Sequence, residues 1–249
     1  MGGKSGSRPA AASAARWPGV LGAVGLFLLV WLSCWYFKQS LLQWVATPLI
    51  NAWPRDLYSP NYLYYEDRAD VFAAYVRLCT IPALIAALPL LTRATVFRQR
   101  VPAAAFIGLS YAATAVALLN VRFSLVPPLL QWLVSVARGW QAAGNGIYCG
   151  SFFHEYVRVA ANLCAAQALG AQLAVVLFYS TMIRRARGES WLEPELRLFG
   201  LSGGALLVGA LLTPVDARSH PRFSLPLIAL YVLATFAGRV VGRTSPRDI

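Results

Sequence analysis

The sequence has few charged residues, and acidic ones are the scarcest. Charged residues make up 13% of its 249 residues, with 10 Asp or Glu against 22 Lys or Arg. A soluble domain carries about 25% charged residues, so the composition excludes an ordinary soluble protein. A net charge of +12 could indicate nucleic-acid binding, but a membrane surface explains it better in so apolar a chain.

Groups that usually carry catalysis or bind metals are also few. The two histidines, His154 and His220, lie at the ends of apolar runs, whereas haem ligands are expected inside helices. The cysteines have neither CxxC nor metal-ligand spacing; they are Cys34, Cys79, Cys149 and Cys164. No Ser-His-Asp, Cys-His, Walker or paired-carboxylate pattern is present. We therefore expect neither an enzyme nor a cofactor or metal site.

What the sequence does contain is long apolar runs. Hydrophobic residues make up 58% of the chain and the mean hydropathy is +0.55. A helix needs about 20 apolar residues to cross a bilayer. The pattern predicts an all-α integral membrane protein with six spans: Val20–Phe37, Phe72–Leu91, Ala103–Leu119, Val157–Ile183, Leu198–Leu212 and Phe223–Ala237. The last two are short and would span only a thinned bilayer.

The spans form one membrane domain, residues 20–239, between basic tails at 1–19 and 240–249. The loop Gln39–Val71 is punctuated by prolines, which predicts short helices and turns. The segment Leu125–Ala137 begins with prolines and is too short to span, so we expect a re-entrant or interfacial helix there.

The distribution of basic residues predicts the orientation. With the N-terminus inside, thirteen Lys or Arg lie in inner segments and seven in outer ones. Inner loops carry the excess of positive charge, so both termini are expected inside. Bound anionic lipid such as cardiolipin is expected at the basic inner loops. The first nineteen residues, basic and without an acid, resemble a mitochondrial targeting segment and equally a basic cytoplasmic tail.

A few polar residues fall in or next to the spans. Arg77 follows Asp70 by seven residues and so lies on nearly the same helical face, with Phe72 between them in the sequence, and Arg158 follows Glu155 by three residues. Local pairing near the outer surface explains both arginines. At 100° per residue, Arg158, Asn162 and Gln172 form a polar stripe, with Gln167 on the opposite side. Such a stripe indicates packing within the bundle, or else a groove for a substrate or partner.

Small residues recur within the fifth span. Gly200 and Gly204 form a GxxxG pattern, which Ala205 and Gly209 continue. This spacing allows close helix packing, within the molecule or with another one.

The corner after the fifth span carries a specific pattern. Thr213-Pro214-x-Asp216 is followed by Ser219, Pro226 and Leu230-Tyr231. Thr213 can cap, Pro214 ends the helix, and Asp216 can accept backbone N–H groups of the next helix, which would brace the corner. The pattern resembles the end of TatC, the multispanning core of the twin-arginine protein translocase.

The resemblance is fainter upstream, and some of its positions differ. Val215 and Val232 replace a proline and a glutamate of the family pattern, while Leu88-Pro89 matches the family's second helix. The resemblance implies a cupped bundle of six helices with short fifth and sixth helices and inside termini. It also implies single-span Tat partners and glutamates that bind the twin-arginine signal at the inner surface.

Those glutamates are missing. Met1–Arg55 and the first inner loop, Thr92–Val101, contain no acid, and Gln172 occupies the place of a buried family glutamate. Ala174 replaces the proline that follows it. We therefore expect a structural subunit of a larger membrane complex, such as a respiratory complex of the mitochondrial inner membrane. The alternative is a divergent, active translocase core in a mitochondrial, bacterial or plastid membrane.

Overall fold

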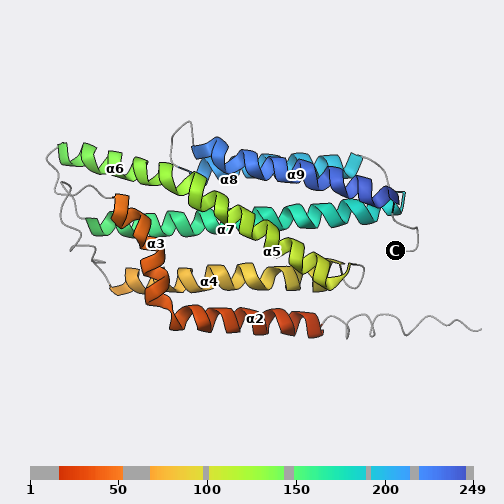
Figure 1. Cartoon of the computed structure of the whole chain (residues 1–249), viewed down its shortest axis with the longest axis horizontal. Helices are drawn as coiled ribbons and strands as arrows, with labels where there is room; N and C mark the ends of the chain where they lie inside the picture. The colour runs from red at the N-terminus through yellow and green to blue at the C-terminus, as the bar shows by residue number, and fades with distance from the viewer. Residues whose placement is uncertain are drawn as a thin grey trace, which may run out of the picture.

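The chain forms a bundle of long helices. The computed structural model describes residues 17–52, 68–97, 101–142, 149–188, 192–213 and 219–244, and within these ranges all regular structure is helical. Six helices there are long and apolar enough to cross a membrane, as predicted. Successive spans run in opposite directions, so α2 begins and α9 ends at the same end of the bundle (Figure 1). Following the predicted orientation, we call this the inner end and the opposite one the outer end.

The first two spans form a hairpin with an extra helix between them. Helix α2 (Trp17–Tyr36) packs mainly on α4 (Arg68–Thr92). Between them, α3 (Lys38–Ala52) crosses the outer end toward α7 and is the short helix predicted in the outer loop (Figure 1). At the inner end α4 passes into a π-helical turn, η2 (Arg93–Phe97).

The third span continues into α6 without reversing. Helix α5 (Ala103–Asn120), the π-helical turn η3 (Val121–Leu125) and α6 (Val126–Ala142) follow one another as a single long helix (Figure 1). The predicted re-entrant path over Leu125–Ala137 is therefore wrong, whereas an interfacial position of this segment stays a prediction. Proline has a helical φ but no N–H, so Pro127 and Pro128 remove two helical hydrogen bonds next to the widened turn and do not end the helix.

The central helix is α7 (Cys149–Ala186), which packs against α4, α5, α8 (Leu192–Leu212) and α9 (Ser219–Thr244). Much of the apolar core lies around it, including the fully buried Tyr156 and Leu163. Helices α8 and α9 contain 21 and 26 residues, so the predicted spans of the last two helices were too short. Helix α8 continues past its apolar run at the inner end, and α9 continues past its own at both ends, because the flanking residues are helical as well.

Candidate functional site

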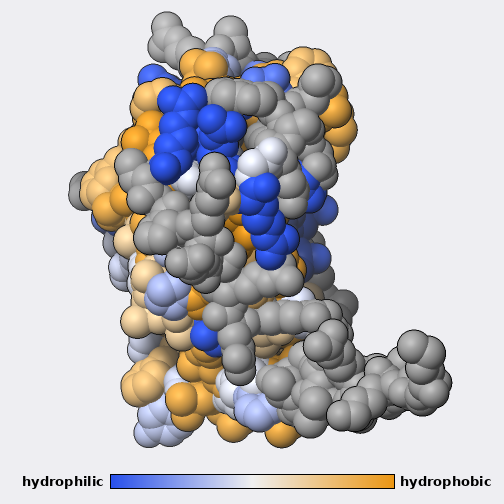
Figure 2. All heavy atoms as spheres, turned by 90° about the vertical axis from the view of Figure 1, so that its right-hand side faces the viewer, coloured by the Kyte–Doolittle hydropathy of each residue, from blue (hydrophilic) through white to orange (hydrophobic). Residues whose placement is uncertain are grey.

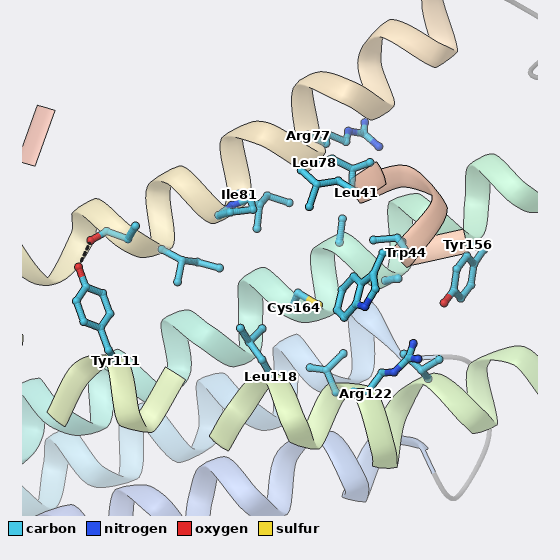
Figure 3. Close-up of a pocket in the computed structure, with 18 residues that line it drawn as sticks. Leu41, Trp44, Arg77, Leu78, Ile81, Tyr111, Leu118, Arg122, Tyr156 and Cys164 are labelled. Carbon is cyan, nitrogen blue, oxygen red and sulfur yellow. Dashed lines mark hydrogen bonds between the residues drawn. The ribbon is translucent and has the colours of Figure 1, made fainter. Parts of the chain in front are cut away.

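An apolar cavity of about 350 Å³ lies between the outer halves of the helices (Figure 3). Helices α3, α4, α5 and α7 contribute to its wall, together with η3 and the start of α6. Its lining is aliphatic and aromatic apart from two arginines and a cysteine: Leu41, Trp44, Val45, Arg77, Leu78, Ile81, Pro82, Ile85, Ala86, Tyr111, Leu118, Val121, Arg122, Val126, Tyr156, Ala160, Ala161 and Cys164. Such a lining suits an apolar ligand with an anionic end.

The two arginines lie toward the outer end of this cavity. Arg77 comes from α4 and is half-buried, and Arg122 comes from η3 and is exposed. The Arg122 guanidinium carbon lies 5.6 Å from the centre of the Trp44 ring, within cation–π range. Trp44 reaches from α3 toward Arg122, and Tyr156 lies beside them (Figure 3). The site therefore combines an apolar interior with a cationic and aromatic outer rim.

The other residues predicted near Arg77 are not part of this cavity. Phe72 is 60% exposed and packs edge-on against Trp35, with ring centres 6.1 Å apart. The backbone of Asp70 lies in α4, but its side chain is outside the described residues, as is that of Glu155. Their predicted pairing with Arg77 and Arg158 stays a prediction.

The predicted polar stripe on α7 divides into an exposed and a buried part. Arg158 and Asn162 are exposed, whereas Gln172 is buried. The Gln172 Nε2 atom donates to the carbonyl oxygen of Ile85, at 2.9 Å, and to the Thr114 hydroxyl, at 3.3 Å. Gln167, on the opposite side as predicted, donates to the carbonyl oxygen of Phe223 at 2.8 Å. Both glutamines therefore connect α7 to its neighbours.

A proline explains the carbonyl that Gln172 binds, and also one that Asn120 binds. In an α-helix a carbonyl accepts from the N–H four residues later. Pro89 has no N–H, so Ile85 loses its helical donor and Gln172 supplies one. Asn120 supplies a long hydrogen bond, 3.4 Å, to the carbonyl of Arg222, four residues before Pro226. The sequence analysis missed this pairing, although the prolines inside apolar runs were its available signal.

The outer corner is partly described. Helix α8 ends at Leu212, and the Gly209 carbonyl in its last turn accepts from both the backbone N–H of Thr213, at 3.0 Å, and the Thr213 hydroxyl, at 2.6 Å. Helix α9 begins at the buried Ser219. Pro214 and Asp216 lie outside the described residues, so the brace that they were predicted to form stays a prediction.

Tyr231, the last residue of the predicted corner pattern, is buried against α7. A Cβ atom on Gly170 would lie 3.1 Å from the Tyr231 hydroxyl oxygen and 2.8 Å from Leu227. The absence of a side chain at Gly170 thus lets α9 approach α7 closely.

The glycines of α8 do not behave as one packing face. A Cβ atom on Gly209 would meet the Ser224 hydroxyl and Phe223, so this glycine does pack against α9. Gly200 and Gly204 have nothing within 4 Å of such an atom, so their predicted packing within the molecule is not found. At 100° per residue, Gly209 lies about 140° around the helix from Gly204 and about 180° from Gly200, so it points to the other side of α8. The contact with another molecule, which the spacing also allows, stays a prediction.

The inner end is rich in arginine. Among the described residues, helices α7, α8 and α9 and the turn that follows α7 contribute Arg184, Arg185, Arg187, Arg197, Arg239 and Arg243. Figure 2 looks onto this end and shows hydrophilic side chains gathered over its upper half, where these three helices end or begin. The one carboxylate whose side chain is described there, that of Glu195, accepts from Arg239 Nη2 at 2.9 Å.

Comparison with known proteins gives two matches and one negative result. The family model described as Sec-independent protein translocase protein (TatC) matches residues 18–226. A solved structure titled "Crystal Structure of Twin Arginine Translocase Receptor- TatC" is similar, with a TM-score of 0.63 and 17% sequence identity, over 92% of this chain and 99% of that one. No curated protein matches significantly.

Proposed function

The chain belongs to the TatC family, and from this premise we propose that it is a structural subunit of a larger membrane complex and no longer a receptor for twin-arginine signals. A respiratory complex of the mitochondrial inner membrane is the proposed setting. The chain would supply a rigid six-helix body against which other membrane subunits pack. Fold resemblance alone does not carry an activity from one protein to another, so the proposal rests on the chemistry of the inner end.

The observation that carries the proposal is the charge of the inner end. A twin-arginine peptide is cationic, and a receptor for it needs carboxylates, which bind guanidinium groups with two hydrogen bonds. Met1–Arg55 and Thr92–Val101 contain no acid. Glu195 is already bound to Arg239. The inner segments carry thirteen Lys or Arg against four acids, Glu189, Glu193, Glu195 and Asp248, so their net positive charge would repel a cationic peptide.

The hydrogen bonds of Gln172 support the same interpretation. The amide of this residue donates to Ile85 and Thr114, which an ionised carboxylate cannot do. At the position where the resemblance implies a glutamate, the side chain thus joins α7 to α4 and α5. This role is structural, and it suits a scaffold better than a recognition site.

An active translocase core is the second candidate. The complete family fold favours it, since the match covers 99% of the solved TatC chain. In that case the chain would bind its substrates in a way that does not use inner carboxylates. Its partners would be single-span Tat proteins, and its membrane could be bacterial, plastid or mitochondrial. In either case anionic lipid such as cardiolipin would bind at the basic inner loops, held by arginines such as Arg184 and Arg185.

Purification of the tagged full chain in a mild detergent from its own membrane tests the proposal. The expected result is co-sedimentation with a respiratory complex at a fixed stoichiometric ratio, which survives dilution and repeated gradient centrifugation. Sedimentation with single-span Tat proteins, in an association that dissociates on dilution, would overturn the structural assignment and favour the translocase. A tagged membrane protein of similar size from the same membrane serves as the control for carry-over.

A further inference from the structure

The cavity between α3, α4, η3 and α7 has the features of a lipid site. We propose that it binds one anionic phospholipid from the outer leaflet, with an acyl chain inside the cavity and the headgroup at the outer rim, where Arg77 and Arg122 lie on opposite walls. Nothing in the proposed function requires this ligand, and the site lies at the end of the bundle opposite the basic inner loops.

The lining of the cavity suits a hydrocarbon chain. Leu78, Ile81 and Ile85 of α4 line one wall. Cys164 of α7 lies across from Leu78 and Ile81 (Figure 3). An acyl chain packs against such a lining without polar groups that would need hydrogen-bond partners inside the cavity.

The outer rim supplies the headgroup chemistry. Among the side chains that the structure describes, no carboxylate pairs with Arg77 or Arg122. A guanidinium group within a membrane span is costly without a counter-charge, and a lipid phosphate accepts hydrogen bonds from it in pairs. Trp44 and Tyr156 line the cavity beside Arg122 (Figure 3), and the exposed Trp44 is of the type found where acyl chains meet headgroups. The two charges therefore favour an anionic lipid over a zwitterionic one.

Photolabelling tests the site and its selectivity together. The full chain is reconstituted in nanodiscs that contain phosphatidylglycerol or phosphatidylcholine, each with the same diazirine-bearing acyl chain, and labelled peptides are mapped by mass spectrometry. We expect labelling at Ile81, Ile85 and Cys164, with phosphatidylglycerol preferred. Each of the substitutions Arg77→Gln and Arg122→Gln should lower that preference by about fivefold. Arg138→Gln, which removes an exposed arginine of α6 outside the cavity, should leave it unchanged.

Competition by unlabelled lipid tests the proposal on the unaltered protein as well. Excess unlabelled phosphatidylglycerol should displace the cavity label, whereas equal phosphatidylcholine should not. Equal labelling by the two lipids, or labelling only on outer helix surfaces, would overturn the proposal. So would capture of a protein segment, in the native complex, by a photoreactive group attached to Cys164.

Discussion

At the residue scale, side-chain amides and prolines occur in pairs across helix contacts. Gln172 meets the carbonyl that Pro89 leaves without its helical donor, and Asn120 does the same for Pro226. An unpaired carbonyl in an apolar interior costs about 1–3 kcal/mol. Gln172 and Asn120 are therefore explained by a proline in the neighbouring helix, without a ligand.

Replacement of Gln172 by the glutamate of the family pattern should therefore destabilise the protein. An ionised carboxylate would face the Ile85 carbonyl without a proton to donate, and a protonated one would donate to only one of the two present acceptors. We expect Gln172→Glu to lower the free energy of unfolding by about 1–3 kcal/mol. Thermal unfolding in detergent measures this change.

The exposed Gln43 of α3 provides the control, because Gln43→Glu makes the same change outside the six spans. This variant should unfold close to the unaltered protein. A Gln172→Glu variant as stable as the unaltered chain would contradict the structural role of the amide.

The predictions for single residues were correct where they depended only on the geometry of one helix. Helical periodicity placed Gln167 and Gln172 on opposite sides of α7, as found. Whether a residue on the stripe is buried depends on which helix packs beside it, so the exposure of Arg158 and Asn162 could not be read from the pattern. For the same reason the sequence analysis named Arg77 without Arg122, its partner across the cavity from η3.

At the scale of elements, α7 and α9 form the most extensive helix contact among the described residues. A Cβ atom on Gly238 would lie 2.6 Å from the carbonyl oxygen of Phe178, and one on Gly242 would lie 2.7 Å from that of Met182. These two glycines form a second GxxxG pattern, which the sequence analysis overlooked in favour of the one in α8. The spacing alone does not distinguish a packed glycine from an exposed one.

Two matched substitutions separate these glycines. Gly238→Ala must push backbone atoms of α7 and α9 apart, because the contact is with a carbonyl and not with a flexible side chain. We expect a loss of about 1–3 kcal/mol in the free energy of unfolding, the usual cost of overpacking. Gly204→Ala adds the same methyl group where nothing lies within 4 Å, and it should be neutral or slightly stabilising.

Denaturation of the two variants in the same detergent measures the difference. If Gly204→Ala destabilised the chain as much as Gly238→Ala, the assignment of α9 as the close partner of α7 would be wrong.

The number and type of the long helices were predictable from the sequence because apolar length determines what can cross a bilayer. The ends of these helices were not predictable in the same way. Helices α8 and α9 extend beyond their apolar runs, and Glu195 and Arg239 join their inner ends by a hydrogen-bonded ion pair. The continuous path from α5 to α6 was missed because prolines were taken as a break, whereas η3 accommodates the missing donors.

At the scale of the whole molecule, charge separates the two candidate functions. The fold is that of TatC, but its inner end presents arginines where a receptor for cationic peptides needs carboxylates. Helix packing keeps the architecture without any signal binding, so the fold can persist in a scaffold.

A single restored carboxylate should not recreate a receptor. Thr95 is exposed in η2, within the first inner loop, so Thr95→Glu adds an accessible acid there. We expect no measurable binding of a fluorescent twin-arginine peptide, because Met1–Arg55 still offers no second carboxylate and the inner arginines still repel the peptide. Fluorescence anisotropy measures this, with Thr95→Gln as the uncharged control. Saturable binding by the glutamate variant alone would contradict the expectation.

The most direct test of the structural role is photo-crosslinking of the unaltered chain, in its native membrane, to a twin-arginine signal peptide. A peptide with two lysines in place of the arginines is the control. The electrostatics of the inner end predict equal, background labelling by the two peptides. A crosslink that requires the arginine pair and maps to the inner loops would contradict a purely structural role.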